Sequence, residues 1–107
     1  MDYQKLILVG NASSDAKLQK SKKGDVSFMT FSMGVKNGKG RSSFFPVVVF
    51  GNLGNSLVKY VTKGRQILAE GRIEVNDSGR FNVVADRIVL GASPQETKSA
   101  EVIEINK

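Results

Sequence analysis

The chain of 107 residues has room for one domain with its own hydrophobic core, and it contains no cysteine and no histidine. This inventory excludes disulfides, zinc sites built from Cys and His, and catalytic arrangements that need either residue. Sixteen Lys and Arg against ten Asp and Glu give a net charge of +6, which favours a polyanionic partner, nucleic acid ahead of an anionic membrane.

Residues 3–11 form the first predicted strand, and their short apolar run predicts neither a secretory signal nor a membrane span. Leu6 and Leu8 fall on one face of this strand, and Ile7 and Val9 fall on the other. Apolar side chains on both faces indicate a strand that is covered on both sides. It is either central to one subunit or paired with a second subunit, and the sequence leaves both open.

Residues 12–24 begin with turn residues and end at Gly24, and they predict a loop or an irregular strand. The segment contains four cations within seven positions, Lys17, Lys20, Lys22 and Lys23. Such a cluster is either a solvated loop or a contact surface for phosphates.

Residues 25–36 alternate and predict a strand. The face that we expect to join the core consists of Met29, Phe31, Met33 and Val35. Phe28 stands on the opposite, largely polar face, where its ring either stacks a nucleobase or fills a second core patch.

Residues 37–41 predict a short hairpin, because Asn37-Gly38 accepts the positive φ that a type I′ turn requires at both central positions. Lys36, Lys39 and Arg41 surround this turn and suit phosphate contacts.

Residues 44–50 are β-branched and aromatic and predict a strand. One face consists of Phe44, Pro46, Val48 and Phe50, and the other of Phe45, Val47 and Val49. Pro46 cannot donate a ladder hydrogen bond, so the strand needs an edge or a bulge at that point.

From Asn52 onward, apolar residues recur at helical spacing, with Asn55 or Ser56 as the expected cap and Lys63-Gly64 as the stop. Strand character returns over residues 66–75. Glu70 and Glu74 share a face there, and we expect them to be solvated or paired with Arg72 and Arg87 rather than to form a catalytic pair.

A tight hairpin at residues 76–79 leads into the last predicted strand, residues 81–90, which Arg80 precedes and Phe81 opens. Along this strand, Val83, Ala85, Arg87 and Val89 are expected on one face. Polar residues with a proline then suggest a linker, so we expect one domain over residues 1–92 and a short tail over 93–107. Alternation near residues 102–106 predicts an added strand in that tail. We prefer this interpretation to a partner-binding motif.

Several of these segments together resemble bacterial single-stranded DNA-binding proteins. The family pattern is an aromatic-x-x-V-V-x-aromatic-G-x-L strand, a helix ending in Y-x-x-K-G, and E-G-R in the next strand. The matching residues are Phe44, Val47, Val48, Phe50, Gly51, Leu53, Tyr60, Lys63, Gly64, Glu70, Gly71 and Arg72. The likeness begins at residues 5–11 and ends at 84–92, so it covers roughly the first 92 residues.

The resemblance implies an all-β fold, a five-stranded OB-fold Greek-key barrel with one short helix between strands 3 and 4. It implies sequence-independent binding and protection of single-stranded DNA in replication, recombination or repair, with no catalytic residue, no metal and no cofactor. The expected nucleic-acid-binding residues are Phe28, Phe44, Phe50, Phe81, Lys17, Lys20, Lys22, Lys23, Lys36, Lys39, Arg41, Arg72 and Arg80. RNA remains open as a ligand, because stacking and phosphate contacts do not distinguish the sugar.

The same resemblance implies a homotetramer, with a homodimer as the second choice. It also implies a location in the bacterial cytoplasm, for a protein that is either nucleoid-associated or phage-encoded. Family members often have longer, aromatic loops before the second hairpin strand and before the last strand, and an acidic tail with a Pro-Phe tip that recruits partners. This chain has short hairpins and ends EVIEINK. It is therefore expected to recruit no partner through such a tip, as a truncated chain or as a phage- or plasmid-type member.

The alternative function is a protein-interaction module of the same fold, like the dimeric primosomal relatives of this family, which bridge replication proteins and bind single strands weakly. The intact segment from Phe44 to Arg72 favours single-strand binding over this alternative.

Overall fold

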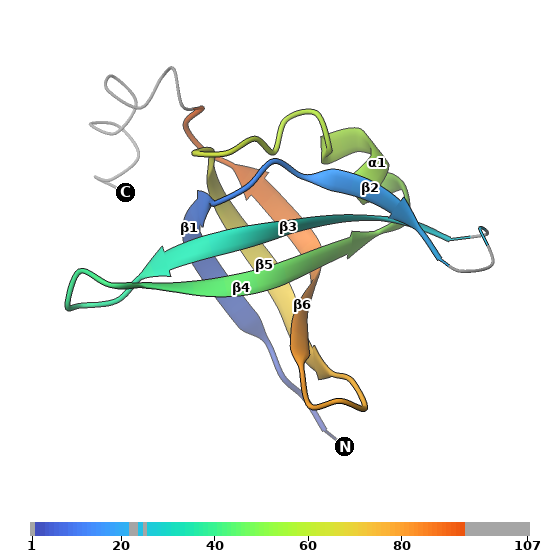
Figure 1. The fold of residues 1–107 in the computed structure, drawn as a ribbon, viewed down its shortest axis with the longest axis horizontal. Coiled ribbons are helices and arrows are strands. Elements are labelled where there is room, and N and C mark those ends of the chain that lie inside the picture. Colours follow the sequence, from blue (N-terminus) through green and yellow to red (C-terminus); the bar gives the residue numbers. More distant parts are fainter. Residues whose placement is uncertain (1, 22–23, 25, 94–107) are drawn as a thin grey trace.

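Period-two alternation along the chain produces a closed barrel of five strands in the computed structural model, which describes residues 2–21, 24 and 26–93 (Figure 1). The barrel strands are β1 (Leu6–Ala12), β3 (Ser27–Lys36), β4 (Ser42–Phe50), β5 (Gln66–Val75) and β6 (Phe81–Leu90). Their order is β1-β5-β6-β4-β3, and β3 returns to β1 to close the ring. The β4–β6 pair is parallel and the other pairs are antiparallel. The predicted five-stranded OB-fold is confirmed.

The lysine-rich segment of residues 12–24 contains one more strand, β2 (Lys17–Lys20), which pairs with the outer edge of β3. All four residues of β2 are exposed. Lys22 and Lys23 lie outside the described residues, as does the tail from residue 94 onward, where an added strand was expected.

The inner faces of the strands form one core. Met29, Phe31 and Met33 of β3 are buried, as predicted, and they meet Val47 and Val49 of β4. Ile67 and Ala69 of β5, with Val83 of β6, complete the interior.

Pro46 lies at an edge of β4 rather than at a bulge. Its cross-strand partner is Ser32, whose backbone N–H and carbonyl bond to Ser14 and Ser13 instead of to β4. The nitrogen of Pro46 therefore faces the β6 side, where pairing covers just Val47 and Val48. Because no ladder partner stands opposite that nitrogen, the missing N–H costs no hydrogen bond.

The helix α1 (Gly51–Leu57) lies between the third and fourth barrel strands, as predicted, but it is shorter and starts earlier than the sequence suggested. Asn55 lies inside the helix, so the expected cap at Asn55 or Ser56 is wrong; the N-cap is Phe50, without a side-chain cap. The chain turns directly from β4 into α1 through Gly51, whose φ is 72°. After Leu57 the turn tightens and carries Val61 into the core.

A bulge in β6 changes the predicted faces of the last strand. Glu70 pairs with Arg87 and Gly71 pairs with Ala85, so Asp86 is the extra residue. A side chain at Gly71 would collide with the Val84 carbonyl oxygen, so glycine permits the close approach of β5 and β6. Beyond the bulge the alternation shifts by one. The core-facing residues there are Ile88 and Leu90, and the prediction that Arg87 and Val89 share the face of Val83 is wrong.

Candidate nucleic-acid interface

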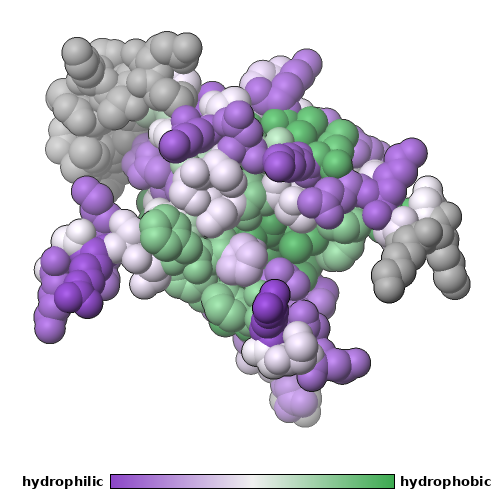
Figure 2. Space-filling view, in the orientation of Figure 1, coloured by the Kyte–Doolittle hydropathy of each residue, from purple (hydrophilic) through white to green (hydrophobic). Residues whose placement is uncertain are grey.

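The outward side of β3 and β4, which we call the ring face, shows an ordered set of cross-strand pairs. From one end to the other these are Phe28 with Phe50, Thr30 with Val48, Ser32 with Pro46, and Gly34 with Phe44. Figures 1 and 2 look onto this side, where hydrophobic side chains gather across the middle and hydrophilic ones cover the projecting ends. Large rings therefore stand at both ends of a surface whose middle is made of small side chains.

Phe28 and Phe50 form an aromatic platform at one end of the ring face. Their ring centroids are 5.7 Å apart and the planes are tilted by 54°. Phe50 is 50% exposed and Phe28 is half-buried beside it. Phe28 thus stands on the face where the sequence placed it, outside the core cluster.

Phe44 stands alone at the other end and is 61% exposed. Its ring lies over Gly34, where a Cβ atom would be 3.3 Å from the ring, so glycine leaves room for the ring against the sheet. Six positions of an extended strand separate Phe44 from Phe50, a distance of about 20 Å at about 3.3 Å per residue.

Phe81 does not lie on the ring face. It packs edge-on against Phe45, with ring centroids 6.2 Å apart, and Phe45 belongs to the inner side of β4. Phe81 is 37% exposed and stands where β6 leaves its hairpin. The structure therefore puts this ring at the end of the barrel, beyond the line from Phe44 to Phe50.

Most of the predicted cations border the ring face or project beyond it. Within the described residues, no ion pair involves Lys17, Lys20, Lys36, Lys39, Arg41 or Arg80. Arg72 is different: its Nη2 is 2.6 Å from Oε2 of Glu74. It stands opposite Val84 of β6, which in turn stands opposite Val48 of β4, so Arg72 lies in one cross-strand row with the middle of the ring face but already has an acidic partner.

The two hairpins that carry Arg41 and Arg80 have the same construction. Asn37 Oδ1 accepts hydrogen bonds from the backbone N–H groups of Lys39 (2.9 Å) and Arg41 (3.3 Å). Gly40 has a φ of 79°, whereas no positive φ occurs at Asn37 or Gly38, so the predicted type I′ turn is wrong. The asparagine side chain closes the turn and needs one left-handed glycine.

In the second hairpin, Asn76 Oδ1 likewise accepts from the N–H groups of Ser78 and Arg80, both at 3.0 Å, and Gly79 has a φ of 86°. The sequence placed both asparagines in turns but did not reveal the hydrogen bonds that their side chains accept. The signal was present as a repeated Asn-x-x-Gly-Arg pattern at residues 37–41 and 76–80.

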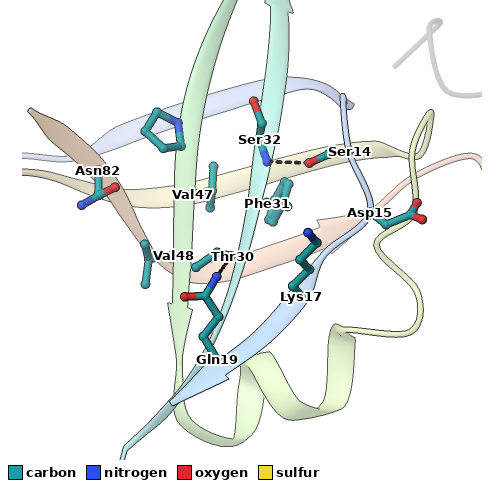
Figure 3. Close-up of a pocket in the computed structure, with 11 residues that line it drawn as sticks. Ser14, Asp15, Lys17, Gln19, Thr30, Phe31, Ser32, Val47, Val48 and Asn82 are labelled. Carbon is teal, nitrogen blue, oxygen red and sulfur yellow. Dashed lines mark hydrogen bonds between the residues drawn. The ribbon is translucent and has the colours of Figure 1, made fainter. Parts of the chain in front are cut away.

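A pocket of about 370 Å³ opens in the middle of the ring face (Figure 3). Its floor is the pair of central cross-strand positions, Thr30 with Val48 and Ser32 with Pro46. The other lining residues are Ser14, Asp15, Lys17, Gln19, Phe31, Val47 and Asn82. Within this set the sequence had singled out Lys17 alone for function.

The outward side of β1, β5 and β6 has a different character, and we call it the aliphatic face. Ile7, Val9 and Val89 are 54%, 53% and 40% exposed on it. The sequence predicted apolar residues on both sides of the first strand, and in the single chain one of those sides remains uncovered.

The charged groups at the centre of the aliphatic face are paired with one another. Glu70 lies 3.2 Å from Lys5 Nζ and 3.0 Å from Arg87 Nη1. The hydrogen bond from Lys5, together with the charges of Lys5 and Arg87, lowers the pKa of Glu70, and the same bond raises the pKa of Lys5. The sequence left Glu70 and Glu74 either solvated or paired with Arg72 and Arg87, and the structure pairs Glu70 with Arg87 and Glu74 with Arg72.

The described residues form neither a membrane-spanning helix nor a cluster of metal ligands. No helix is long and apolar enough to cross a membrane. No three side chains of the metal-ligating types gather at one place in that part of the chain.

Comparison with known proteins gives consistent relatives. A single-stranded DNA-binding protein of Clostridium tetani (strain Massachusetts / E88) is 32% identical, over 78% of this chain and 67% of that protein. A single-stranded DNA-binding protein of Clostridium perfringens (strain 13 / Type A) is 28% identical, over 64% of this chain and 47% of that protein. The chain thus spans about half to two thirds of the length of these curated relatives.

Solved structures share the barrel. A deletion mutant of the single-stranded DNA binding protein from Thermus aquaticus has a TM-score of 0.71 and 26% identity, over 85% of this chain and 42% of that chain. A mitochondrial single-stranded DNA binding protein from S. cerevisiae has a TM-score of 0.74 over 84% of this chain and 95% of that chain. Its 23% identity shows the fold alone. The model of the single-strand binding protein family matches residues 3–88, most of the chain, and on this ground the chain belongs to that family.

Proposed function

We propose that this protein binds single-stranded DNA without reading its sequence, by stacking bases on the rings of the ring face and holding phosphates with the cations around it. The observation that carries the proposal is the exposure of Phe44 and Phe50 on strands whose other large apolar side chains are buried or half-buried. A ring that is half or more exposed gains little from the core, whereas each stacked base contributes about 1–3 kcal/mol.

The cations support the electrostatic half of this proposal. Lys17 and Lys20 border the ring face on the β2 side, and Lys36, Lys39 and Arg41 gather at the β3–β4 hairpin beside Phe44. Because these side chains have no internal ion pair among the described residues, they remain available to replace counterions on phosphates. Arg80 and Phe81 extend the proposed path beyond the barrel end, whereas Glu74 already satisfies Arg72, which makes Arg72 the weakest member of the set.

We place this binding in the protection of exposed strands during replication, recombination or repair in a bacterial cytoplasm, without catalysis. Membership of the family supports this role. The arrangement of the aliphatic face supports a homo-oligomer, a tetramer ahead of a dimer, in which Ile7 and Val9 are covered by a second copy.

The test is the substitution Phe44→Ala, measured as the dissociation constant for fluorescein-labelled oligothymidylate. We expect a loss of about tenfold or more, the size of one lost stacking contact. Tyr60→Ala is the matched control, since Tyr60 is also an exposed ring, 46% exposed, but lies after α1 beneath the Lys59 ammonium. Equal affinities of Phe44→Ala and the unmodified protein would reject the stacking role.

A salt titration of the unmodified protein tests the other half of the proposal. The logarithm of the affinity should fall linearly with the logarithm of salt concentration, with a slope that reflects several phosphate contacts at about 0.7 per contact for single strands. A slope near zero would contradict the phosphate contacts. Repeating the titration with oligouridylate compares RNA with DNA, and weak binding to every oligonucleotide from about ten to seventy nucleotides would favour the protein-bridging alternative instead.

A further inference from the structure

The pocket in the middle of the ring face occupies the stretch that a bound strand must cross. Phe44 and the Phe28–Phe50 platform are about 20 Å apart along β4, far more than the spacing of two stacked bases. A single strand that contacts both ends therefore runs over Thr30, Ser32, Pro46 and Val48. These side chains are shorter than the rings on either side, and the result is the pocket of about 370 Å³.

Three of the polar groups that line this pocket can donate a hydrogen bond to a ligand. Gln19 Nε2 donates to Thr30 Oγ1 at 3.2 Å, so the Thr30 hydroxyl hydrogen remains free to point at a ligand. Ser14 Oγ accepts from the backbone N–H of Ser32 at 3.3 Å, which leaves the Ser14 hydroxyl hydrogen free in the same way. Lys17, an obligate donor, lines the same wall (Figure 3).

The charge of the pocket suits an uncharged occupant. Lys17 contributes one positive charge, and Asp15 contributes one negative charge at the rim, where its Oδ1 accepts a hydrogen bond from the Lys63 N–H at 2.8 Å. A phosphate would meet the Asp15 carboxylate as well as the Lys17 ammonium. A base meets no such repulsion, and its carbonyl oxygens match the free donors.

We propose that this pocket takes one unstacked base, edge first, and prefers thymine, whose edges present two carbonyl oxygens, over adenine, whose ring-nitrogen acceptors stand beside an amino group that is itself a donor. The inference rests on the proposed single-strand binding and adds a specific place in the path where the identity of one base matters. The stacking rings at either end are indifferent to sequence, because every base offers a flat face.

The test is a scan of a short oligothymidylate, about eight nucleotides long, a length within the site sizes of OB-folds, in which each thymine in turn is replaced by adenine. We expect one position to lose about three- to tenfold in affinity, the size of one or two hydrogen bonds to neutral groups, and the other positions to change less than about twofold. An equal loss at every position would overturn the pocket, because it would reflect the general stacking tendency of adenine.

Two variants tie the effect to the pocket. Thr30→Val keeps the β-branched shape and removes the hydroxyl, and Gln19→Leu changes an exposed β2 side chain that the core does not need. Each should reduce the adenine penalty at that position to less than about twofold, and Gln19→Leu keeps the test decisive if Thr30→Val fails to fold. Thr62→Val, the same change at an exposed threonine that does not line the pocket, is the matched control and should retain the penalty.

The outcomes distinguish the pocket proposal from the proposal of single-strand binding on which it rests. If the unmodified oligothymidylate binds and Phe44→Ala weakens it, but the scan shows no special position, the pocket proposal alone fails. If the oligothymidylate does not bind, or Phe44→Ala changes nothing, the single-strand binding proposal fails first.

Discussion

The ring face and the aliphatic face are both built by alternation along β-strands, on different sides of one barrel. On the ring face, the outward residues of β3 and β4 are rings at the ends and small side chains between them, and the cations nearby have no internal partner among the described residues. On the aliphatic face, the outward residues are Ile7, Val9 and Val89, and the charges between them form the cluster of Lys5, Glu70 and Arg87.

The difference shows how an exposed hydrophobic surface can suit two kinds of partner. Flat rings beside unpaired cations match a ligand that offers flat bases and phosphates. Branched aliphatic side chains around paired charges match the apolar surface of another protein, because aliphatic side chains bind no phosphate and bury well against their own kind. The predictions that follow alter one face at a time, from the largest expected effect to the smallest.

Removing both ends of the ring face should give the largest loss. The Phe44→Ala, Phe50→Ala double variant is expected to bind oligothymidylate about a hundredfold more weakly, because each ring contributes about tenfold and sites about 20 Å apart act independently. Fluorescence titration of the two single variants and the double variant completes a cycle. A double variant no weaker than either single one would contradict independent contributions of the two rings.

The substitution Val9→Asp should break the aliphatic face with a smaller effect, on self-association. Losing a buried valine and placing a carboxylate at an apolar contact should raise the subunit dissociation constant by about tenfold or more. Sedimentation equilibrium measures this change. Thr62→Asp, which adds the same charge at an exposed site away from β1, is the control, and unchanged assembly of Val9→Asp would show that this face is not the contact.

Loosening the hairpins should have a modest effect on DNA affinity. Asn37→Ala removes the acceptor for the N–H groups of Lys39 and Arg41, and we expect about a two- to threefold loss, less than one net hydrogen bond in value. The salt slope should not change, because the number of cations is the same. Asn37→Ser, which can form a weaker turn of the same kind, should restore part of the loss. A changed salt slope would instead indicate a lost phosphate contact.

Acid should have the smallest effect of the four changes, a loss of the stability that the ion pairs of Glu70 contribute on the aliphatic face. The pKa of Glu70 is lowered from its ordinary value of 4.5, so its ion pairs stabilise the fold fully above that value and are lost as the pH falls through the lowered pKa. Thermal melts of Glu70→Gln should therefore differ from those of the unmodified protein at neutral pH and converge with them in strong acid. Glu74→Gln, which removes an exposed pair, is the control. A constant difference at every pH would contradict the ion-pair role.

The sequence predicted the features that depend on local alternation. Met29 and Met33 inside and Phe44 and Phe50 outside follow from period two, and the structure has them so. The bulge at Asp86 escaped prediction because Val83, Val84 and Ala85 are all apolar and do not show where the phase shifts. Alternation alone cannot locate an extra residue of this kind.

Features that depend on particular side-chain contacts could not be predicted from the sequence either. The turn at Asn37 is decided by a side-chain hydrogen bond rather than by φ preferences alone. The pocket joins Ser14 and Asn82, which are far apart in the chain. Arg72 was expected to pair with a glutamate, but the placed side chains were needed to show that Glu74, and not Glu70, is its partner.

The proline at position 46 has a consequence for solubility. The β6-facing edge of β4 is open over Ser42–Pro46, and Phe44 and Phe45 make that stretch aromatic. An open, aromatic edge is a template on which another chain can add a strand and start an aggregate. Pro46 interrupts the row of N–H donors there, and Arg41 places a charge next to it. This edge can therefore expose the Phe44 ring to a ligand without pairing with the strands of neighbouring molecules.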